Sequence, residues 1–208
     1  QEHNPLISFV RQGATIVAAN TRNGPLVADN YLLCAGAWSG DLGNATELAD
    51  TSAKRINVQP VKGQMLLFNA KPGLLNRVVL ANCRYLIPRN DGRILVGSTL
   101  EFEGFDKTPT DEAHYSLYES AMSLMPALER YPVEAHWCGL RPGSPGGIPY
   151  IGRVPETDNL FVNAGHFRNG LVLAPASCRL VADLILGRKP IIDADPYRLE
   201  ACRPERLL

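Results

Sequence analysis

Short apolar runs separated by polar turns dominate the first thirty residues of the chain and predict strands. Residues 6–10 and 15–19 each form such a run. Arg22-Asn23-Gly24 predicts a hairpin turn between strands, because Asn-Gly tolerates positive φ. A more continuous apolar run then ends in Ala35-Gly36-Ala37. Such a run is typical of a parallel strand whose carboxyl end meets a ligand, since glycine lets the backbone and a ligand approach closely.

From residue 57 to about residue 103 the pattern changes to antiparallel strands joined by tight turns. The turn Arg89-Asn90-Asp91-Gly92-Arg93 connects two of them, because Asn, Asp and Gly favour turn conformations. The predicted strands cover residues 64–68, 77–81, 85–88 and 93–98. A further strand is expected at 133–138.

The clearest predicted helix runs from Asp111 to about Arg130, and either Thr110 or Asp111 can cap its first turn. Apolar side chains recur along it at helical spacing and predict a buried face. The members of this face are Tyr115, Leu117, Tyr118, Ala121, Met122, Leu124 and Met125.

Glycine and proline punctuate the last third of the chain. Residues 140–152 are so rich in both that the segment is expected to be an ordered loop. After the apolar run 160–162, a last helix is predicted from about Ala174 to Leu186, ending at Gly187. The tail after Asp193 is expected to be irregular. The fold class is therefore α+β, with an antiparallel sheet in the middle and pieces of a parallel, doubly wound sheet at both ends.

Composition excludes several classes of protein. The 208 residues carry 21 basic and 21 acidic side chains, which argues against a nucleic acid or a charged membrane surface as a partner. No apolar run approaches the roughly 18 to 20 residues of a membrane span. The five cysteines are dispersed without a C-x-x-C pair, which argues against a structural metal site or a disulfide framework. A soluble, cytoplasmic protein is expected.

Two arginines and a tyrosine are candidates for chemistry. Arg141 stands on a glycine-rich segment, where its planar fork could capture a carboxylate or simply bond loop carbonyls. Arg168 lies in "GHFRNG", between His166 and Asn169, where the side chains could satisfy the loop or border a helix start that binds an anion or polarised carbonyl. Tyr85 on a strand is either packing or part of a pocket wall. No G-x-G-x-x-G and no G-x-S-x-G occurs.

Five ordered motifs are more specific than these single residues: "ADNYLLCAGAWSG", "PVKGQML", "YLIPRNDGRILVGST", "GLRPGSPGGIPYIG" and "GHFRNGLVLAPASCRLVADLI". Together they resemble the FAD-dependent D-amino-acid oxidase (DAO) family, most closely its glycine oxidase branch of thiamine biosynthesis. The resemblance implies the later half of that fold. Residues 1–45 would belong to the FAD-binding domain, 46–140 to the antiparallel substrate domain and 141–190 to the returning strand and helix of the FAD-binding domain, with an irregular tail at 191–208.

The resemblance also implies roles for individual residues. Arg141 matches the arginine that pairs with the substrate carboxylate, Arg168 a second arginine near the substrate, and Tyr85 a tyrosine whose hydroxyl helps bind the carboxylate. No side chain is implied as a catalytic base. The residues implied to contact FAD are Leu6, His166, Phe167, Arg168, Asn169, Gly170, Leu171 and Val172.

The implied reaction is oxidation of glycine, sarcosine or a small D-amino acid to an imino or oxo acid, with electrons passing from FAD to oxygen and hydrogen peroxide formed. One alternative is a dehydrogenase of the same family that uses another electron acceptor. Another is a non-catalytic fragment or subunit, since the resemblance places the dinucleotide motif before Gln1 and implies weak FAD binding by this chain alone. Such a chain is expected to need its N-terminal FAD-binding segment as a partner and to form homo-oligomers.

Overall fold

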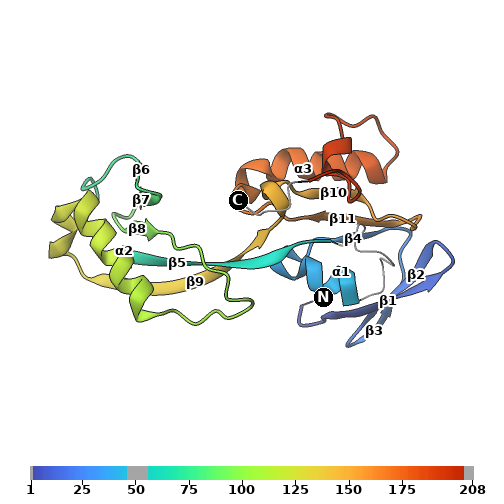
Figure 1. The fold of residues 1–208 in the computed structure, drawn as a ribbon, viewed down its shortest axis with the longest axis horizontal. Helices are drawn as coiled ribbons and strands as arrows, with labels where there is room; N and C mark the ends of the chain where they lie inside the picture. Colours follow the sequence, from blue (N-terminus) through green and yellow to red (C-terminus); the bar gives the residue numbers. More distant parts are fainter. Residues whose placement is uncertain (1, 46–55, 204–208) are drawn as a thin grey trace. The chain divides into compact units, whose positions relative to one another are not determined.

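The computed structural model describes residues 2–45 and 56–203 (Figure 1). Parts of the predicted substrate-domain and tail segments, residues 46–55 and 204–208, lie outside the described residues. The chain divides into two compact units. The first comprises Gln1–Gln59 with Pro142–Leu208, and the second comprises Pro60–Arg141. The assignment of one to FAD and the other to substrate remains a prediction from the sequence.

The first unit contains two small sheets. One is the antiparallel sheet β1-β2-β3, formed by Leu6–Gln12, Thr15–Thr21 and Gly24–Leu26. Its β2–β3 hairpin turns at Arg22-Asn23, where the sequence pattern predicts it, and Gly24 has a φ of 112°. The second sheet has the order β10-β11-β4, from Tyr150–Arg153, Leu160–Ala164 and Tyr31–Leu33.

The apolar run before Ala35-Gly36-Ala37 is a parallel strand, as its sequence predicts. β4 pairs parallel with β11, and Tyr31 stands opposite Leu160. A 3-10 turn (Gly36–Trp38) and the short helix α1 (Ser39–Ala45) follow it. Helix α3 (Gly170–Ile185) packs Leu180 and Val181 against Ile151 and Phe161 of the same sheet. Leu160, Val162 and their neighbours on the sheet build a further core with Ile16 and Val58.

The second unit is a five-stranded sheet with the order β6-β7-β8-β5-β9. Its strands are β5 (Gln59–Phe68), β6 (Val79–Ala81), β7 (Arg84–Pro88), β8 (Ile94–Gly97) and β9 (Val133–Gly143). The pairs β5–β8, β6–β7 and β7–β8 are antiparallel, which confirms the predicted change of sheet type. Helix α2 (Asp111–Leu124) lies on one face of this sheet, where its Leu117 and Ala121 pack on Leu66, Leu86 and Val96. The α+β class is confirmed.

Helix α2 is shorter than the sequence pattern predicts. Thr110 is its N-cap and accepts a hydrogen bond from the backbone N–H of Ala113, but the helix ends at Leu124 and a 3-10 turn takes Pro126–Arg130. Proline lacks an N–H and disfavours helical φ/ψ in the residue before it, and Met125 accordingly has φ −151° and ψ 82°. The predicted apolar face was wrong at Tyr115, which is 65% exposed.

The glycine- and proline-rich segment 140–152 is not the single loop that its composition predicts. Strand β9 continues through Gly143, and β10 begins at Tyr150. Only the 3-10 turn at Pro145–Gly147 and its neighbours are irregular. Strand β9 can contain a proline because it lies at the edge of its sheet, where proline is tolerated. Helix α3 also begins earlier than predicted, at Gly170, with Pro175 in its second turn. No helix within residues 2–45 and 56–203 combines the length and apolar character needed to cross a membrane.

Candidate active site

Arg141 is held by the sheet of the second unit. Its Nη1 donates to the carbonyl oxygens of Thr99 (3.2 Å) and Lys62 (3.5 Å), and its Nη2 donates to the hydroxyl of Ser98 (2.6 Å). Among the described residues, Nε has no hydrogen-bond partner. The guanidinium is therefore fixed on one side of its planar fork while donors remain for a ligand.

Gly63 makes room for this arrangement. A Cβ built on Gly63 would overlap Cζ, Nη1 and Nη2 of Arg141. The guanidinium therefore lies directly against the α-carbon of Gly63 on β5. A glycine within a strand often marks such a close approach, and the motif "PVKGQML" contains one.

Tyr85 has the same relation to a second glycine. Tyr85 on β7 stands opposite Gly97 on β8. A Cβ on Gly97 would lie 2.8 Å from Cε2 and 2.9 Å from both Cζ and the hydroxyl oxygen of Tyr85. The phenol ring thus lies across the α-carbon of Gly97.

The alternation of side chains places both groups on one face of the sheet. Leu66 and Val96 point into the core under α2. Met65 is paired with Gly97, so Gly63, Met65 and Gly97 face away from α2. The Arg141 guanidinium and the Tyr85 ring therefore share the face opposite α2. A cation and a phenol hydroxyl on one face have the chemistry of a carboxylate site.

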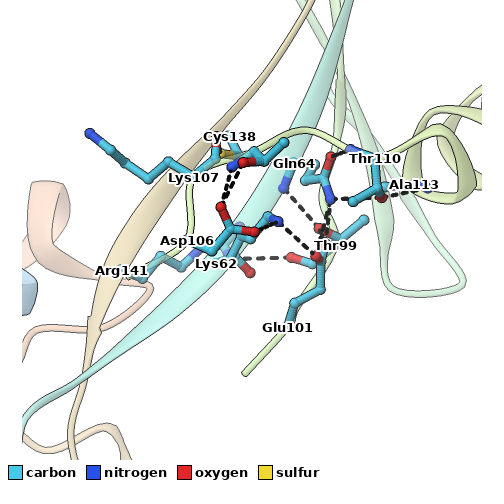
Figure 2. Close-up of polar contacts among 11 residues, drawn as sticks. Lys62, Gln64, Thr99, Glu101, Asp106, Lys107, Thr110, Ala113, Cys138 and Arg141 are labelled. Carbon is cyan, nitrogen blue, oxygen red and sulfur yellow. Dashed lines mark hydrogen bonds and ion pairs between the residues drawn. The ribbon is translucent and has the colours of Figure 1, made fainter. Parts of the chain in front are cut away.

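A polar network occupies the α2 face of the same strands (Figure 2). Lys62 is paired with Glu101 (3.7 Å) and Asp106 (3.5 Å), and Gln64 donates to both carboxylate oxygens of Glu101 at 3.0 Å. The pKa of Asp106 is lowered, first by the hydrogen bond from the Thr108 hydroxyl. The hydrogen bond from the backbone N–H of Thr108 and the charge of Lys62 lower it further. The sequence did not predict these residues as functional. Only the burial of Lys62 distinguishes them, and burial depends on the tertiary structure.

The turn before α3 carries most of the predicted cofactor residues and lies within the first unit. Ser144 donates its hydroxyl hydrogen to the carbonyl of Gly165 (2.5 Å), and the backbone N–H of Phe167 donates to the carbonyl of Pro142 (3.0 Å). Gly165 and Phe167 both have positive φ, 81° and 48°. The Phe167 ring is buried while Arg168 is exposed, so the turn anchors itself by Phe167 and presents Arg168 outward.

The start of α3 leaves backbone donors free for a ligand. Its N-cap Asn169 makes no side-chain capping bond, and the first intrahelical bond at this end runs from the N–H of Leu173 to Asn169 (2.9 Å). The N–H groups before it have no intrahelical partner. Leu171 and Val172 are 92% and 83% exposed, an unusual state for apolar side chains at a helix start.

His166 and Leu6 complete the set of predicted cofactor residues. Burial lowers the pKa of His166, which favours the neutral ring, and its Nε2 is buried without a hydrogen-bond partner. Leu6 opens β1 and packs partly buried against the core of the first unit. An orphaned imidazole nitrogen, free helix N–H groups and exposed apolar side chains fit a large, flat cofactor with polar edges. The individual roles of these residues, and those of Arg141, Tyr85 and Arg168, remain predictions.

Comparison with known proteins decides the family. The family model of FAD dependent oxidoreductases (DAO) matches residues 1–184. The chain belongs to this family. Among its relatives, glycine oxidase of Pseudomonas aeruginosa is 55% identical over 196 residues, covering 94% of this chain and 52% of the relative. Glycine oxidase of Bacillus subtilis is 34% identical over 189 residues, covering 90% of this chain and 49% of the relative.

Solved structures of similar proteins have the same fold. Glycine oxidase from Geobacillus kaustophilus superimposes with a TM-score of 0.87 at 31% identity, covering 96% of this chain and 52% of that chain. An L-proline dehydrogenase from P. horikoshii gives a TM-score of 0.86 at 25% identity, covering 96% of this chain and 54% of that one. The chain thus spans about half the length of the relatives it matches. FAD is the cofactor of the family.

Proposed function

We propose that the protein oxidises glycine, sarcosine or a small D-amino acid to the corresponding imino acid, using FAD and passing the electrons to oxygen with formation of hydrogen peroxide. The similarity to glycine oxidases supports the substrate class. The observation that carries the proposal is the position of Arg141. Its guanidinium lies against the α-carbon of Gly63 and donates to three acceptors, while its Nε has no hydrogen-bond partner among the described residues.

In this proposal Arg141 binds the carboxylate of the amino acid. The Tyr85 hydroxyl, on the same face of the sheet, donates a second hydrogen bond to the carboxylate, and Arg168 adds a further positive charge near the substrate. Holding the carboxylate orients the α-carbon. The contribution of these side chains is positioning, and no general base among them is required.

Residues 166–172 and Leu6 would hold FAD. The free N–H groups at the start of α3 would donate to its polar edge, while Leu171, Val172 and Leu6 would cover apolar parts. FAD, when bound, supplies the two-electron acceptor. The positive end of the α3 dipole would favour negative charge at that edge.

The decisive experiment uses the FAD-loaded protein expressed from its complete coding sequence. Bleaching of flavin absorbance is followed without oxygen after adding glycine, sarcosine or D-alanine. One of these is expected to reduce the flavin, and Arg141→Ala is expected to raise the KM by at least about thirtyfold, because truncating one partner of a charged pair costs ~2 kcal/mol or more. Arg93→Ala, at an exposed ion pair, is the matched control. Unchanged substrate binding in Arg141→Ala would refute the proposal.

A second candidate function is that of a dehydrogenase, favoured by the similarity to the L-proline dehydrogenase structure. It differs only in the electron acceptor. The reduced protein is therefore mixed with air-saturated buffer or with a quinone analogue. Rapid reoxidation by air with hydrogen peroxide formed supports the oxidase, whereas reoxidation by the quinone alone supports the dehydrogenase.

We further propose, from the sequence, a cytoplasmic location and self-association into homo-oligomers. The exposed apolar side chains Ile7, Leu26 and Val27 of the first unit and Val78 and Leu80 of the second are consistent with buried contacts in a larger assembly.

A further inference from the structure

The polar network on the α2 face contains two almost fully buried polar side chains. Lys62 is 1% and Gln64 0% exposed. Both lie on β5 and flank Gly63, the glycine on which Arg141 rests. Burying an ammonium and an amide is costly unless each is satisfied, so their presence beside Gly63 requires an explanation.

Glu101 is the group that satisfies them. Its carboxylate accepts from Gln64 Nε2, accepts from the Thr99 hydroxyl, and is paired with the Lys62 ammonium. Gln64 is fixed from its other end as well, since its carbonyl oxygen accepts the backbone N–H of Thr110, the N-cap of α2, at 2.9 Å. One carboxylate thus joins β5 to the segment that follows β8.

The same segment supplies hydrogen-bond acceptors for Arg141. Lys62 and Glu101 exchange backbone hydrogen bonds of 2.9 and 3.0 Å, and the backbone N–H of Gln64 donates to the Thr99 hydroxyl at 2.8 Å. The carbonyl groups of Lys62 and Thr99 accept from Arg141. The network therefore contacts Arg141 only through backbone carbonyls. In Figure 2, Arg141 lies to the left of Lys62 and Glu101, and Thr110 lies to their right.

Stability alone is a weak reason for this network. Replacing a buried ion pair by apolar residues of similar volume is often neutral or stabilising. What the network does provide is a defined position of the Thr99 carbonyl, in the irregular segment after β8, beside the Lys62 carbonyl on β5. Orientation of a guanidinium within about half an ångström is what a carboxylate site requires.

We propose that Glu101 is a positioning residue for Arg141, acting across the sheet through Thr99 and Lys62. This inference rests on the proposed role of Arg141 in binding the substrate carboxylate. Glu101 touches neither substrate nor cofactor. Its removal is expected to weaken carboxylate binding while leaving the limiting rate of flavin reduction much less affected.

The test compares Glu101→Gln with the unaltered protein in its FAD-loaded form. Acetate, a carboxylate without an amine, is titrated by calorimetry and by the change in flavin absorbance. The acetate Kd and the amino-acid KM are expected to rise about tenfold, which is within the range of coupling between residues of one hydrogen-bond network. Glu134→Gln removes a carboxylate from an exposed ion pair on β9, the strand of Arg141, and is expected to leave both values unchanged.

A double-mutant cycle separates positioning from general destabilisation. In the Arg141→Ala background, adding Glu101→Gln is expected to change the acetate Kd by no more than about twofold, because Glu101 acts through the missing guanidinium. Additive losses would overturn the inference. If Arg141→Ala alone left acetate binding unchanged, the proposed function would fall and the inference with it. If Arg141→Ala weakened binding but Glu101→Gln did not, only the inference would fall.

A second pair of variants protects the test against a folding defect. Thr99→Val keeps the shape of a nearly buried side chain but removes the hydroxyl that links Gln64 and Glu101. Thr99→Ser keeps the hydroxyl. The valine variant is expected to raise the acetate Kd and the serine variant to restore it. Equal affinity in the two variants would overturn the inference.

Discussion

At the residue scale, Arg141 rests against the α-carbon of Gly63, and its guanidinium occupies the space that a side chain would take there. Tyr85 is related to Gly97 in the same way. Both glycines are strand residues and neither has a positive φ, so a left-handed backbone conformation is not what favours glycine at these positions. The two glycines thus let polar side chains lie flat on the sheet.

Gly63→Ala is therefore expected to displace the Arg141 guanidinium. The KM for the amino acid should rise about tenfold, equivalent to ~1.4 kcal/mol, because the fork loses its fixed orientation. The melting temperature should change little, since the end of a flexible side chain can move aside. Steady-state kinetics and thermal melting measure the two effects.

Gly139→Ala is the matched control for that substitution. Gly139 lies on β9 two residues before Arg141, and a Cβ there meets no atom within 4 Å. Its KM should equal that of the unaltered protein. A KM unchanged in Gly63→Ala, or raised equally in both variants, would contradict the assignment.

At the element scale, α2 and β9 meet at a pair of histidines. The rings of His114 and His136 are 5.3 Å apart, and His136 Nε2 is buried without a partner. Burial lowers the pKa of His136, and His114 lowers it further, whereas Asp111 and Glu101 act in the opposite direction. The packing of α2 on β9 thus favours a neutral His136.

Stability is expected to fall as the pH drops below about 6.5, the ordinary histidine value, because the unfolded chain then binds a proton that folded His136 resists. The effect is absent above that pH and complete below the lowered pKa. His136→Phe should reduce the loss of melting temperature between about pH 7.5 and about pH 5.5. Substitution of the exposed His3 by Asn is the control, and an identical pH dependence in all three proteins would disprove the assignment.

At the scale of the whole molecule, the chain builds separate cores in its two units. The core under α2 contains Leu66, Leu117 and other residues of 60–141 alone. The cores around Leu160 and Leu180 contain residues of the first unit alone. The chain passes between the units twice, at Gln59–Pro60 and at Arg141–Pro142.

Destabilising one core should therefore affect its own unit first. Leu117→Ala is expected to cost about 2 to 5 kcal/mol and to speed amide exchange in β5 to β8 and α2. Leu160→Ala should do the same in β4, β10, β11 and α3. Exchange mass spectrometry measures both. Loss of protection throughout the chain from either variant would show that the two cores unfold as one.

Local pattern determined the kinds of element and several of their ends. The apolar run before Gly36 predicts β4 as a parallel strand, and Thr110, one of the two candidate caps, is the N-cap of α2. These features depend on neighbours within one or two turns of chain. Pro126 is the local signal for the true end of α2, because proline disfavours helical φ/ψ in the residue before it.

What the sequence by itself determined was the α+β class and, through its ordered motifs, the family. The partner of β4 and the acceptors of Arg141 were decided only by the tertiary structure. Tyr31 pairs with Leu160, and Arg141 bonds groups 42, 43 and 79 residues away in the chain. Local propensity carries no information about such distant pairings, because packing and hydrogen bonding across the folded sheet select them. The same reason explains why Lys62 and Glu101 emerged only from the structure.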